Sequence, residues 1–576
     1  MPVIHIASAT ELANYKIKEE NEIQELQAQA YNYWLNKIEV IYEQLISDHG
    51  YIDRRPYQAK YAALYCTRPK NLCAGEMGIG KSFIALLMIY AIYGDNLAHR
   101  RPGTIQILAP KRLSAESRWL VDARCIAGLR DQVSLITKAG DTQTNESPVW
   151  IYTHDFLKRK HPALRGNTKD SVSDYISRYR RPSCLVLDEI HNCKPGSKRS
   201  QHVAKVRRRA NRFLALSGTL TDGRLDLLNY CLSLTYGEDW QFYNRNKEFT
   251  DLYGTQKKIS SNYVRGEEEL FDQEKPNRTL GTLALHKAPE FYSQTQCYIH
   301  RSKLSDPDVL PTLHIPDSHI ETETIKMTTA QQSLYEAIIF DNWSAFNRLA
   351  EITEGRLEHR AAALNLIRKL IYVTSCPSAL SSNLNLVPAK ATLVINKLRD
   401  AMKAREKTVV FCNAVAGARL ISALCASEAS LCDAYKRVYA SDDLATPAKM
   451  SEDARADALS QFLFNPDVMI GIMSINITHE SIDLTSAQNV IFYDLPWQAI
   501  KILQALCRAV RPGNPHPLVK TLFPITEGTV DVYIYQLMST KMAASRRIHD
   551  FDFSDSSDAS SLNPLNIIRS IVNERS

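Results

Sequence analysis

Residues 75–82 spell Gly-Glu-Met-Gly-Ile-Gly-Lys-Ser, which fits the phosphate-binding pattern Gly-x-x-x-x-Gly-Lys-Ser. The short apolar segment Leu72–Ala74 precedes this stretch, and the apolar run Phe83–Tyr93 follows it. The pattern therefore predicts a strand, a glycine-rich loop and a helix in succession.

The residue types in this loop suit contact with phosphate. Glycines let backbone N–H groups close around phosphate oxygens, and the first turn of a helix adds a favourable potential. Lys81 would neutralise the β- and γ-phosphates, and the hydroxyl of Ser82 would be a ligand for Mg²⁺. The predicted phosphate-binding residues are Gly75, Gly78, Gly80, Lys81 and Ser82. Kinases, switches, transporters and motors share such a loop, so it does not decide the class of protein.

Two carboxylates follow another predicted strand. The apolar segment Cys184–Leu187 is followed by Asp188-Glu189-Ile190-His191. Asp188 at the end of a strand would hold Mg²⁺ through water, and Glu189 would polarise the attacking water. This pair predicts hydrolysis of the bound nucleotide.

Two arginines far along the chain form the third motif that indicates nucleotide hydrolysis. Residues 504–511 fit Gln-x-x-x-Arg-x-x-Arg. On a helix, Gln504, Arg508 and Arg511 share one face, so all three would point across a cleft. Arginine keeps its charge and binds phosphate oxygens through two N–H groups, so Arg508 and Arg511 would reach the γ-phosphate from a second lobe.

Short apolar strands alternate with helical patterns in two blocks of the chain, which predicts two α/β lobes, each a parallel sheet covered by helices. The strands expected in the first block are Leu72–Ala74, Ile105–Ala109, Val149–Tyr152, Cys184–Leu187 and Phe213–Leu216. Those expected in the second block are Thr408–Cys412, Val468–Met473, Asn489–Tyr493 and Thr521–Phe523.

The pattern divides the chain into five parts. We expect an N-terminal helical extension at 1–50 with one or two amphipathic helices, lobe 1 at 51–237, helical insertions and a linker at 238–385, lobe 2 at 386–545, and a flexible acidic and Ser-rich tail at 546–576.

Composition narrows the class of protein. The content of 44% hydrophobic and 23% charged residues is typical of a folded soluble protein, and the length of 576 residues predicts two or more domains. The net charge of +7 permits a polyanionic partner without requiring one. The 12 cysteines form no Cys-x-x-Cys pair, which favours a reducing compartment and no structural zinc site. The first residues lack the pattern of a signal peptide, and no apolar run reaches membrane-spanning length. We expect a cytoplasmic protein, or one in the nucleoid or nucleus, with no membrane contact.

The order of these motifs resembles that of the superfamily-2 helicases and translocases. Asp188-Glu189-Ile190-His191 is similar to the family's second motif, and Arg55-Pro56-Tyr57-Gln58 is similar to its adenine-binding motif, which implies that Gln58 contacts the base. The segments 107–119 and 151–157 resemble those that contact a nucleic-acid backbone, and 214–223 resembles the Ser/Thr-Gly-Thr motif. The resemblance implies two RecA-like lobes that use ATP and Mg²⁺, with Gln504 also at the nucleotide.

Further segments are similar to the SWI/SNF-type ATPases of that superfamily. "RPYQ" and "GEMGIGKS" resemble the start of the family's first lobe, and 490–513 and 523–541 resemble its second lobe. The likeness runs over about residues 50–545 and is nearer to minimal DNA-annealing members and viral relatives than to large remodelers. It implies a motor that moves on duplex or branched DNA through backbone contacts. We expect a monomer whose N-terminal helices and tail either recruit protein partners or simply cap the fold.

The chain departs from the family at its fifth motif. The segment 474–484, "SINITHESIDL", has Ile477, Thr478, His479 and Ser481 where the family has a glycine-rich sequence. Glycine allows close approach of the backbone, so the coupling between DNA and ATP is in doubt there. The basic segment 205–212 faces either DNA or solvent.

Three functions remain open. We expect a DNA-dependent ATPase that translocates on duplex DNA to anneal it, migrate branches or remodel bound protein. A strand-separating helicase on DNA or RNA is the first alternative. A nucleotide-regulated DNA-binding adaptor with weak hydrolysis is the second, and the unusual fifth motif supports it.

Overall fold

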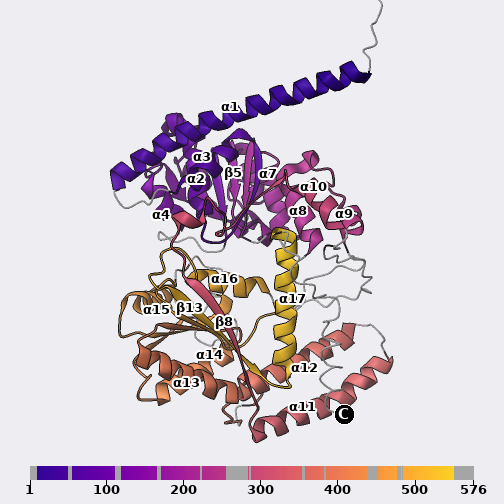
Figure 1. Cartoon of the computed structure of the whole chain (residues 1–576), viewed down its shortest axis with the longest axis vertical. Coiled ribbons are helices and arrows are strands. Elements are labelled where there is room, and N and C mark those ends of the chain that lie inside the picture. Colours follow the sequence, from indigo (N-terminus) through magenta and orange to yellow (C-terminus); the bar gives the residue numbers. More distant parts are fainter. Residues whose placement is uncertain are drawn as a thin grey trace, which may run out of the picture. The chain divides into compact units, whose positions relative to one another are not determined.

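A computed structural model describes residues 9–49, 55–110, 118–126, 128–164, 170–218, 220, 224–254, 283, 287–352, 357–381, 384–438, 452–476, 482, 484–497 and 499–550. The chain divides into two compact units, each built on its own parallel sheet (Figure 1). Lobe 1 consists of Met1–Gly218, Tyr230–Tyr243 and Thr295–Thr312, and lobe 2 consists of Thr219–Asn229, Asn244–Gln294 and Leu313–Ser576. The fold is therefore α/β with two RecA-like lobes, as predicted.

The sheet of lobe 1 has seven parallel strands in the order β3-β4-β2-β5-β6-β1-β7. The central strands β2 and β5 are buried along their whole length, because helices cover both faces of such a sheet. The strands are β1 (Lys70–Gly75), β2 (Ile105–Ala109), β3 (Val133–Leu135), β4 (Val149–Thr153), β5 (Cys184–Leu187), β6 (Arg212–Leu216) and β7 (Ile299–Ser302).

Local sequence sets the ends of the helices in lobe 1. Pro56 occupies the first turn of α2, where its missing N–H costs nothing. Ser171 and Asp174 form a capping box at the start of α6, and Ser197 caps α7. The helices are α1 (Ala9–His49), α2 (Pro56–Thr67), α3 (Lys81–Tyr93), α4 (Arg118–Cys125), α5 (Asp141–Thr144), α6 (Val172–Tyr179), α7 (Lys198–Arg207) and the second half of α8 (Leu225–Tyr236).

The N-terminal extension is one long helix, α1, whose second half packs on α2 and α3 (Figure 1). Tyr42 and Leu45 on this half are buried. α1 therefore belongs to lobe 1 instead of standing as a separate extension.

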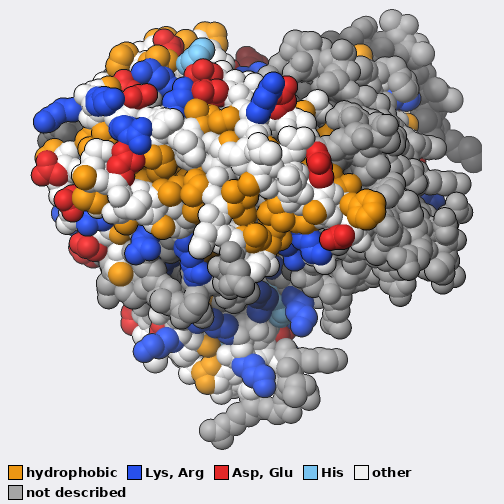
Figure 2. Space-filling view, turned by 90° about the horizontal axis from the view of Figure 1, so that it is seen from below, with side chains coloured by type: hydrophobic (Ala, Val, Ile, Leu, Met, Phe, Trp, Pro, Cys, Tyr) orange, Lys and Arg blue, Asp and Glu red, His pale blue; other side chains and the backbone are white. Residues whose placement is uncertain are grey.

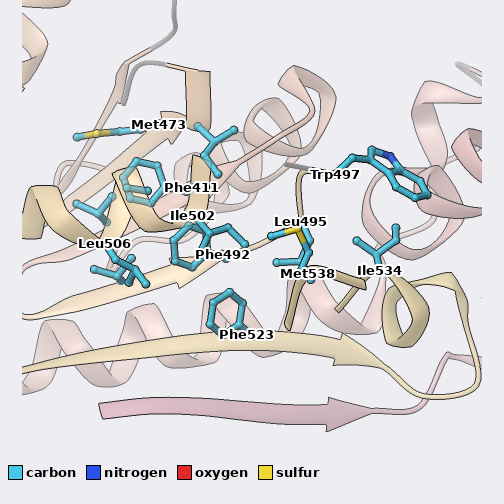
Figure 3. Packing of buried hydrophobic residues seen from close by; sticks show 14 of the residues in the cluster. Phe411, Met473, Phe492, Leu495, Trp497, Ile502, Leu506, Phe523, Ile534 and Met538 are labelled. Carbon is cyan, nitrogen blue, oxygen red and sulfur yellow. The ribbon is translucent and has the colours of Figure 1, made fainter. Parts of the chain in front are cut away.

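The sheet of lobe 2 has six parallel strands in the order β10-β11-β9-β12-β13-β8. Its core contains a column of aromatic rings from adjacent strands, in which Phe492 lies between Phe411 and Phe523 with ring centroids 5.5 and 5.0 Å away (Figure 3). The strands are β8 (Asp317–Ile325), β9 (Thr408–Cys412), β10 (Tyr435–Val438), β11 (Ile470–Ser474), β12 (Asn489–Phe492) and β13 (Leu518–Thr526).

Helices surround this second sheet, and α13 and α17 both contact β13. The helices of this unit are α9 (Asn246–Tyr253), nearly all of α10 (Ala288–Thr295), α11 (Thr329–Ile352), α12 (Leu357–Ser375), α13 (Ala389–Ala404), α14 (Val415–Ser427), α15 (Glu452–Phe464), α16 (Ala499–Ala509) and α17 (Val530–Asp550). Among the described residues, α9 and α10 make no extensive contact with its sheet. None of the helices in the described ranges is long and apolar enough to cross a membrane. Figure 2 shows Lys and Arg side chains mixed with Asp and Glu on the face drawn there.

The segment 238–385, where helical insertions and a linker are expected, also contributes two strands. It contains β7, which pairs with β1 in lobe 1, and β8, which pairs with β13 in lobe 2. Both are edge strands with polar sequences, and most residues of β8 are exposed, so the apolar pattern of a buried strand is missing. At the other end, α17 continues to Asp550, so the start of the predicted tail is helical, and residues 551–576 lie outside the described residues.

Candidate nucleotide-binding site

The loop between β1 and α3 has a backbone that glycine alone adopts without strain. Gly78 and Gly80 have φ angles of +94° and +88°. A Cβ atom on Gly80 would also lie 2.4 Å from Nε2 of Gln58. The two glycines therefore let the chain turn tightly into α3, whose first residue is Lys81.

The side chain of Lys81 lies inside the turn of this loop. Its Nζ donates to the carbonyl oxygens of Gly75, at 2.8 Å, and Glu76, at 3.1 Å. A Cβ atom on Gly218, just after β6, would lie 2.8 Å from Cγ of Met77 and 3.5 Å from the same Nζ, so this glycine permits the close approach of its segment to Met77 beside Lys81. Ser82 follows Lys81 and is partly exposed. The ammonium and the start of α3 thus offer positive charge and N–H donors at one place, which suits phosphate.

Asp188 directly follows β5 and accepts a hydrogen bond from the indole N–H of Trp119, at 2.9 Å. Burial first, and the charge of Glu189 second, raise the pKa of Asp188 to about 6. The carboxylate is therefore costly to ionise here, and a bound cation would stabilise its charged form.

Mg²⁺ fits the donors at this place. It prefers oxygen ligands and takes one or two carboxylates together with substrate phosphates and waters. The carboxylate of Asp188 and the hydroxyl of Ser82 are donors of that kind. No group of three or more His, Cys, Asp or Glu that could hold a metal occurs among the described residues.

Glu189 adopts the left-handed conformation, with φ +51° and ψ 57°. For a residue with a side chain this costs roughly 1–2 kcal/mol, and such strain is often found at active sites. Its Oε2 lies 3.2 Å from Nδ1 of His191, which in turn lies 2.9 Å from the hydroxyl of Ser217. The second carboxylate is thus connected to the segment after β6 that approaches Lys81.

Gln58, the predicted adenine contact, is hydrogen-bonded within the protein, and its contact with the base stays a prediction. It is 3% exposed, its Oε1 accepts from the hydroxyl of Tyr42 at 2.6 Å, and its Nε2 donates to the carbonyl of Ile79 at 3.0 Å. The hydroxyl of Tyr57 donates to the same carbonyl at 2.9 Å. The amide therefore braces the phosphate loop against α1 and α2.

Lobe 2 holds the remaining predicted residues. Gln504 is buried on α16, and Arg508 lies in the last turn of that helix, half-buried. α16 ends at Ala509, so the prediction that Arg511 shares its helical face is wrong. Pro512 and Gly513, the latter with φ +96°, follow Arg511, and a helix does not continue through this pair.

The structure thus brings Lys81, Ser82, Asp188 and Glu189 to one edge of lobe 1. That Arg508 and Arg511 act on the same nucleotide stays a prediction. The residues of the unusual fifth motif that lie at 477–481 and 483, and residues 111–117 of the expected DNA-contacting segment, lie outside the described residues.

Two partners of the site were not predicted. Trp119 stands in a segment that resembles a DNA-contacting motif, and its bond to Asp188 has no signature in sequence spacing. Tyr42 lies within an ordinary amphipathic pattern, and nothing in the sequence connects it to Gln58.

Two helicase family models match the chain, one mostly over residues of lobe 1 and one over residues of lobe 2. The DEAD/DEAH box helicase family matches residues 55–227, and the helicase conserved C-terminal domain matches residues 390–513, together slightly more than half of the chain.

Full-length relatives are larger. The chain is 21% identical over 488 residues to an uncharacterized ATP-dependent helicase of Mycoplasma genitalium, covering 84% of this chain and 41% of the relative. It is 23% identical over 507 residues to the human SWI/SNF-related matrix-associated actin-dependent regulator of chromatin subfamily A member 1, covering 83% and 42%. The chain thus spans about two fifths of the length of these relatives. Among solved structures, a Sulfolobus solfataricus SWI2/SNF2 ATPase core in complex with dsDNA is 20% identical with a TM-score of 0.36, covering 88% of this chain and 94% of that chain.

Proposed function

We propose that this chain, which belongs to the SWI/SNF-type ATPases of helicase superfamily 2, is a DNA-dependent ATPase that moves along duplex DNA and remodels DNA or DNA–protein complexes. The observation that carries the proposal is the meeting of Lys81, Asp188 and Glu189 at one edge of lobe 1, in the spacing and order of that family.

Each residue at this edge has a part in hydrolysis. N–H groups at the start of α3 and the ammonium of Lys81 bind the β- and γ-phosphates. Ser82 and Asp188 would hold Mg²⁺ together with the nucleotide, and the bound ion would neutralise charge on the phosphates. Glu189 orients a water molecule and accepts its proton as the oxygen attacks the γ-phosphorus, and the bond to the β-phosphate oxygen breaks to release ADP and phosphate.

Lobe 2 would make this reaction depend on closure. Arg508 and Arg511 supply guanidinium groups to the γ-phosphate, where charge spreads in the transition state. Since these arginines lie on the other lobe, hydrolysis would proceed only when the lobes close on ATP, and opening after release would complete one step. This separation supports a motor instead of a kinase.

DNA is the proposed track. The net charge of +7 is compatible with contacts to DNA phosphates, which carry most of the affinity of sequence-independent binding. The human relative is named a regulator of chromatin, and a relative in Bacillus subtilis is named a putative ATP-dependent helicase/translocase, which supports an ATP-driven motor of the translocase kind.

The test compares ATP turnover with duplex DNA, single-stranded DNA and RNA, together with displacement of a third strand from a DNA triplex. We expect the largest stimulation from duplex DNA, displacement of the third strand, and loss of both in Lys81→Ala. Glu189→Gln should keep ATP binding and lose turnover. Stimulation by RNA alone would refute the proposal, and absence of stimulation by any nucleic acid would favour the adaptor function.

A further inference from the structure

The phosphate loop is joined to a second segment of lobe 1, residues 302–306, at the point where both leave the sheet. The strands β1 and β7 pair in parallel as far as Gly75 and Ser302. Beyond this pair, the backbone N–H of Glu76 donates to the carbonyl of Ser302, at 2.8 Å. The first residues of the phosphate loop are therefore held against the chain that follows β7.

The side chain of Glu76 makes a second bond between the same two segments. Its Oε2 accepts from the backbone N–H of Leu304, at 2.8 Å. The ladder of β1 and β7 ends at Ser302, so strand pairing does not account for this bond. A carboxylate is also a stronger acceptor than a carbonyl. Of the two bonds that Glu76 makes to this segment, only the one to Leu304 depends on its side chain.

The segment that Glu76 binds is a series of closed turns. The backbone N–H of Lys303 donates to Oδ2 of Asp306, at 2.7 Å. The N–H groups of Val309 and Leu310 both donate to the carbonyl of Asp306, at 2.9 Å, and Val309 is fully buried. Because consecutive hydrogen bonds close these turns, a displacement of Leu304 is passed along the segment.

These turns lead directly into the second lobe. Residues Thr295–Thr312 belong to lobe 1, and the chain enters lobe 2 at Leu313. The first strand of that lobe along the chain, β8, begins soon afterwards, at Asp317. The covalent path from the N–H group that Glu76 binds to the sheet of lobe 2 is therefore short.

The backbone of Glu76 contacts the residue that is expected to bind phosphate. Nζ of Lys81 donates to the carbonyls of Gly75 and Glu76, at 2.8 and 3.1 Å. Phosphate oxygens compete with these carbonyls for the ammonium, because a charged acceptor forms the stronger bond. Binding of ATP therefore weakens the hold of Lys81 on the same residue whose carboxylate binds Leu304.

We propose that Glu76 is a positioning residue that transmits the occupancy of the phosphate loop to residues 302–312, and so to the chain that enters lobe 2. The inference rests on the proposed function, since it takes the loop to bind ATP and lobe 2 to respond. A carboxylate that only closed the end of a strand would hold Leu304 equally with and without nucleotide. Dependence on nucleotide therefore separates the two roles.

The test uses Glu76→Ala and Glu76→Gln, with Asp141→Ala as the matched control. Glu76→Ala removes the acceptor, whereas the amide oxygen in Glu76→Gln can still accept from Leu304. Asp141 also accepts a backbone N–H through its carboxylate, from Lys138 at 2.9 Å, in the segment between β3 and β4. The control therefore removes a bond of the same kind elsewhere in lobe 1.

Hydrogen exchange of residues 302–312, measured by mass spectrometry with and without a non-hydrolysable ATP analogue, reports the coupling. Without nucleotide, exchange at Leu304 should be about ten- to a hundredfold faster in Glu76→Ala, as expected for the loss of a bond to a charged acceptor. The analogue should alter exchange of this segment in the wild type, in Glu76→Gln and in the control, and leave it unaltered in Glu76→Ala.

Steady-state kinetics give a second measurement on the same proteins. At saturating duplex DNA, kcat should fall about tenfold or more in Glu76→Ala while KM for ATP stays within about threefold, because the change impairs the response to bound ATP and not its binding. Glu76→Gln should recover most of kcat, and Asp141→Ala should match the wild type.

Four results would overturn the inference. The first is a wild type in which the analogue does not alter exchange of residues 302–312, and the second is a wild-type response in a folded Glu76→Ala protein. The third is a loss of ATP affinity with kcat unchanged, which would make the carboxylate part of the shape of the loop. The fourth is an equal loss of turnover in Asp141→Ala.

Failure of the proposed function would be seen separately, because the exchange measurement needs no DNA. A wild type whose turnover ignores every nucleic acid, but whose exchange at residues 302–312 responds to the analogue through Glu76, would refute the DNA-dependent motor and leave the coupling in place.

Discussion

Trp119→Phe should shift the pH dependence of the ATPase, because this change removes the N–H that donates to Asp188 and keeps an aromatic ring at a buried position. A hydrogen bond to a charged group contributes about 1.5–3 kcal/mol, and one pH unit corresponds to about 1.4 kcal/mol. The pKa of Asp188, about 6 in the wild type, should therefore rise to about 7 or 8 in the variant.

The Mg²⁺ requirement of ATP turnover should increase in the variant, because a proton and Mg²⁺ compete for the carboxylate of Asp188. At pH 7 a group with a pKa of 6 is about 90% ionised, whereas one with a pKa of 7 to 8 is about 50% to 10% ionised. The Mg²⁺ concentration for half-maximal ATP turnover at pH 7 should therefore increase about two- to tenfold in Trp119→Phe. The difference in Mg²⁺ requirement between the two proteins should vanish at about pH 9, where Asp188 is ionised in both the wild type and the variant.

Steady-state turnover at several Mg²⁺ concentrations and pH values measures this effect. Trp150→Phe is the matched control, since Trp150 is also buried in lobe 1 and its indole donates to Asn145, at 3.1 Å, away from the carboxylates. The reasoning is refuted if a folded Trp119→Phe protein has the Mg²⁺ and pH profile of the wild type, or if Trp150→Phe shows the same shift.

Three other substitutions test the packing around the site and in lobe 2. Gly80→Ala combines a positive φ with a Cβ atom 2.4 Å from Gln58, so it should abolish ATP binding in calorimetry, whereas Gly140→Ala, where no atom lies within 4 Å of the added Cβ, should bind like the wild type. Tyr42→Phe removes the bond from α1 to Gln58 and should weaken ATP affinity several-fold, with the free energy of unfolding lowered by only about 1 kcal/mol; unchanged affinity would show that α1 does not brace the loop. Lys390→Met leaves the buried carboxylate of Asp531, 2.9 Å from the ammonium in the wild type, without a counter-charge. The free energy of unfolding of lobe 2 in urea should therefore fall by about 3–5 kcal/mol. A loss below about 1 kcal/mol would contradict the ion pair.

Sequence pattern predicted the interior of both sheets and missed their edges. Every interior strand has an apolar run, because helices cover it on both faces. The edge strands β3, β7, β8 and β10 were not predicted. β8 pairs with β13 over nine residues, yet its sequence is Asp-Ser-His-Ile-Glu-Thr-Glu-Thr-Ile, so only the fold shows that it is a strand.

The residues expected to act on the nucleotide could be predicted from the sequence, whereas the hydrogen bonds that hold them in place could not. Lys81 and Asp188 take their positions from the ends of β1 and β5, which follow from local motifs. The bonds from Trp119 and Tyr42 join segments distant in sequence, and no spacing rule reports them. Arg511 shows the limit of helical periodicity, because the helix ends before the pattern does.

The most direct test of the central claim is ATP turnover by Arg508→Ala and Arg511→Ala at saturating duplex DNA, measured beside ATP binding. The account holds that lobe 1 binds the nucleotide and lobe 2 completes the catalytic site. It predicts that both variants bind ATP with near wild-type affinity and lose turnover by about 10³-fold or more, as expected for an arginine that stabilises the transition state. Turnover within about threefold of the wild type in both variants would contradict it.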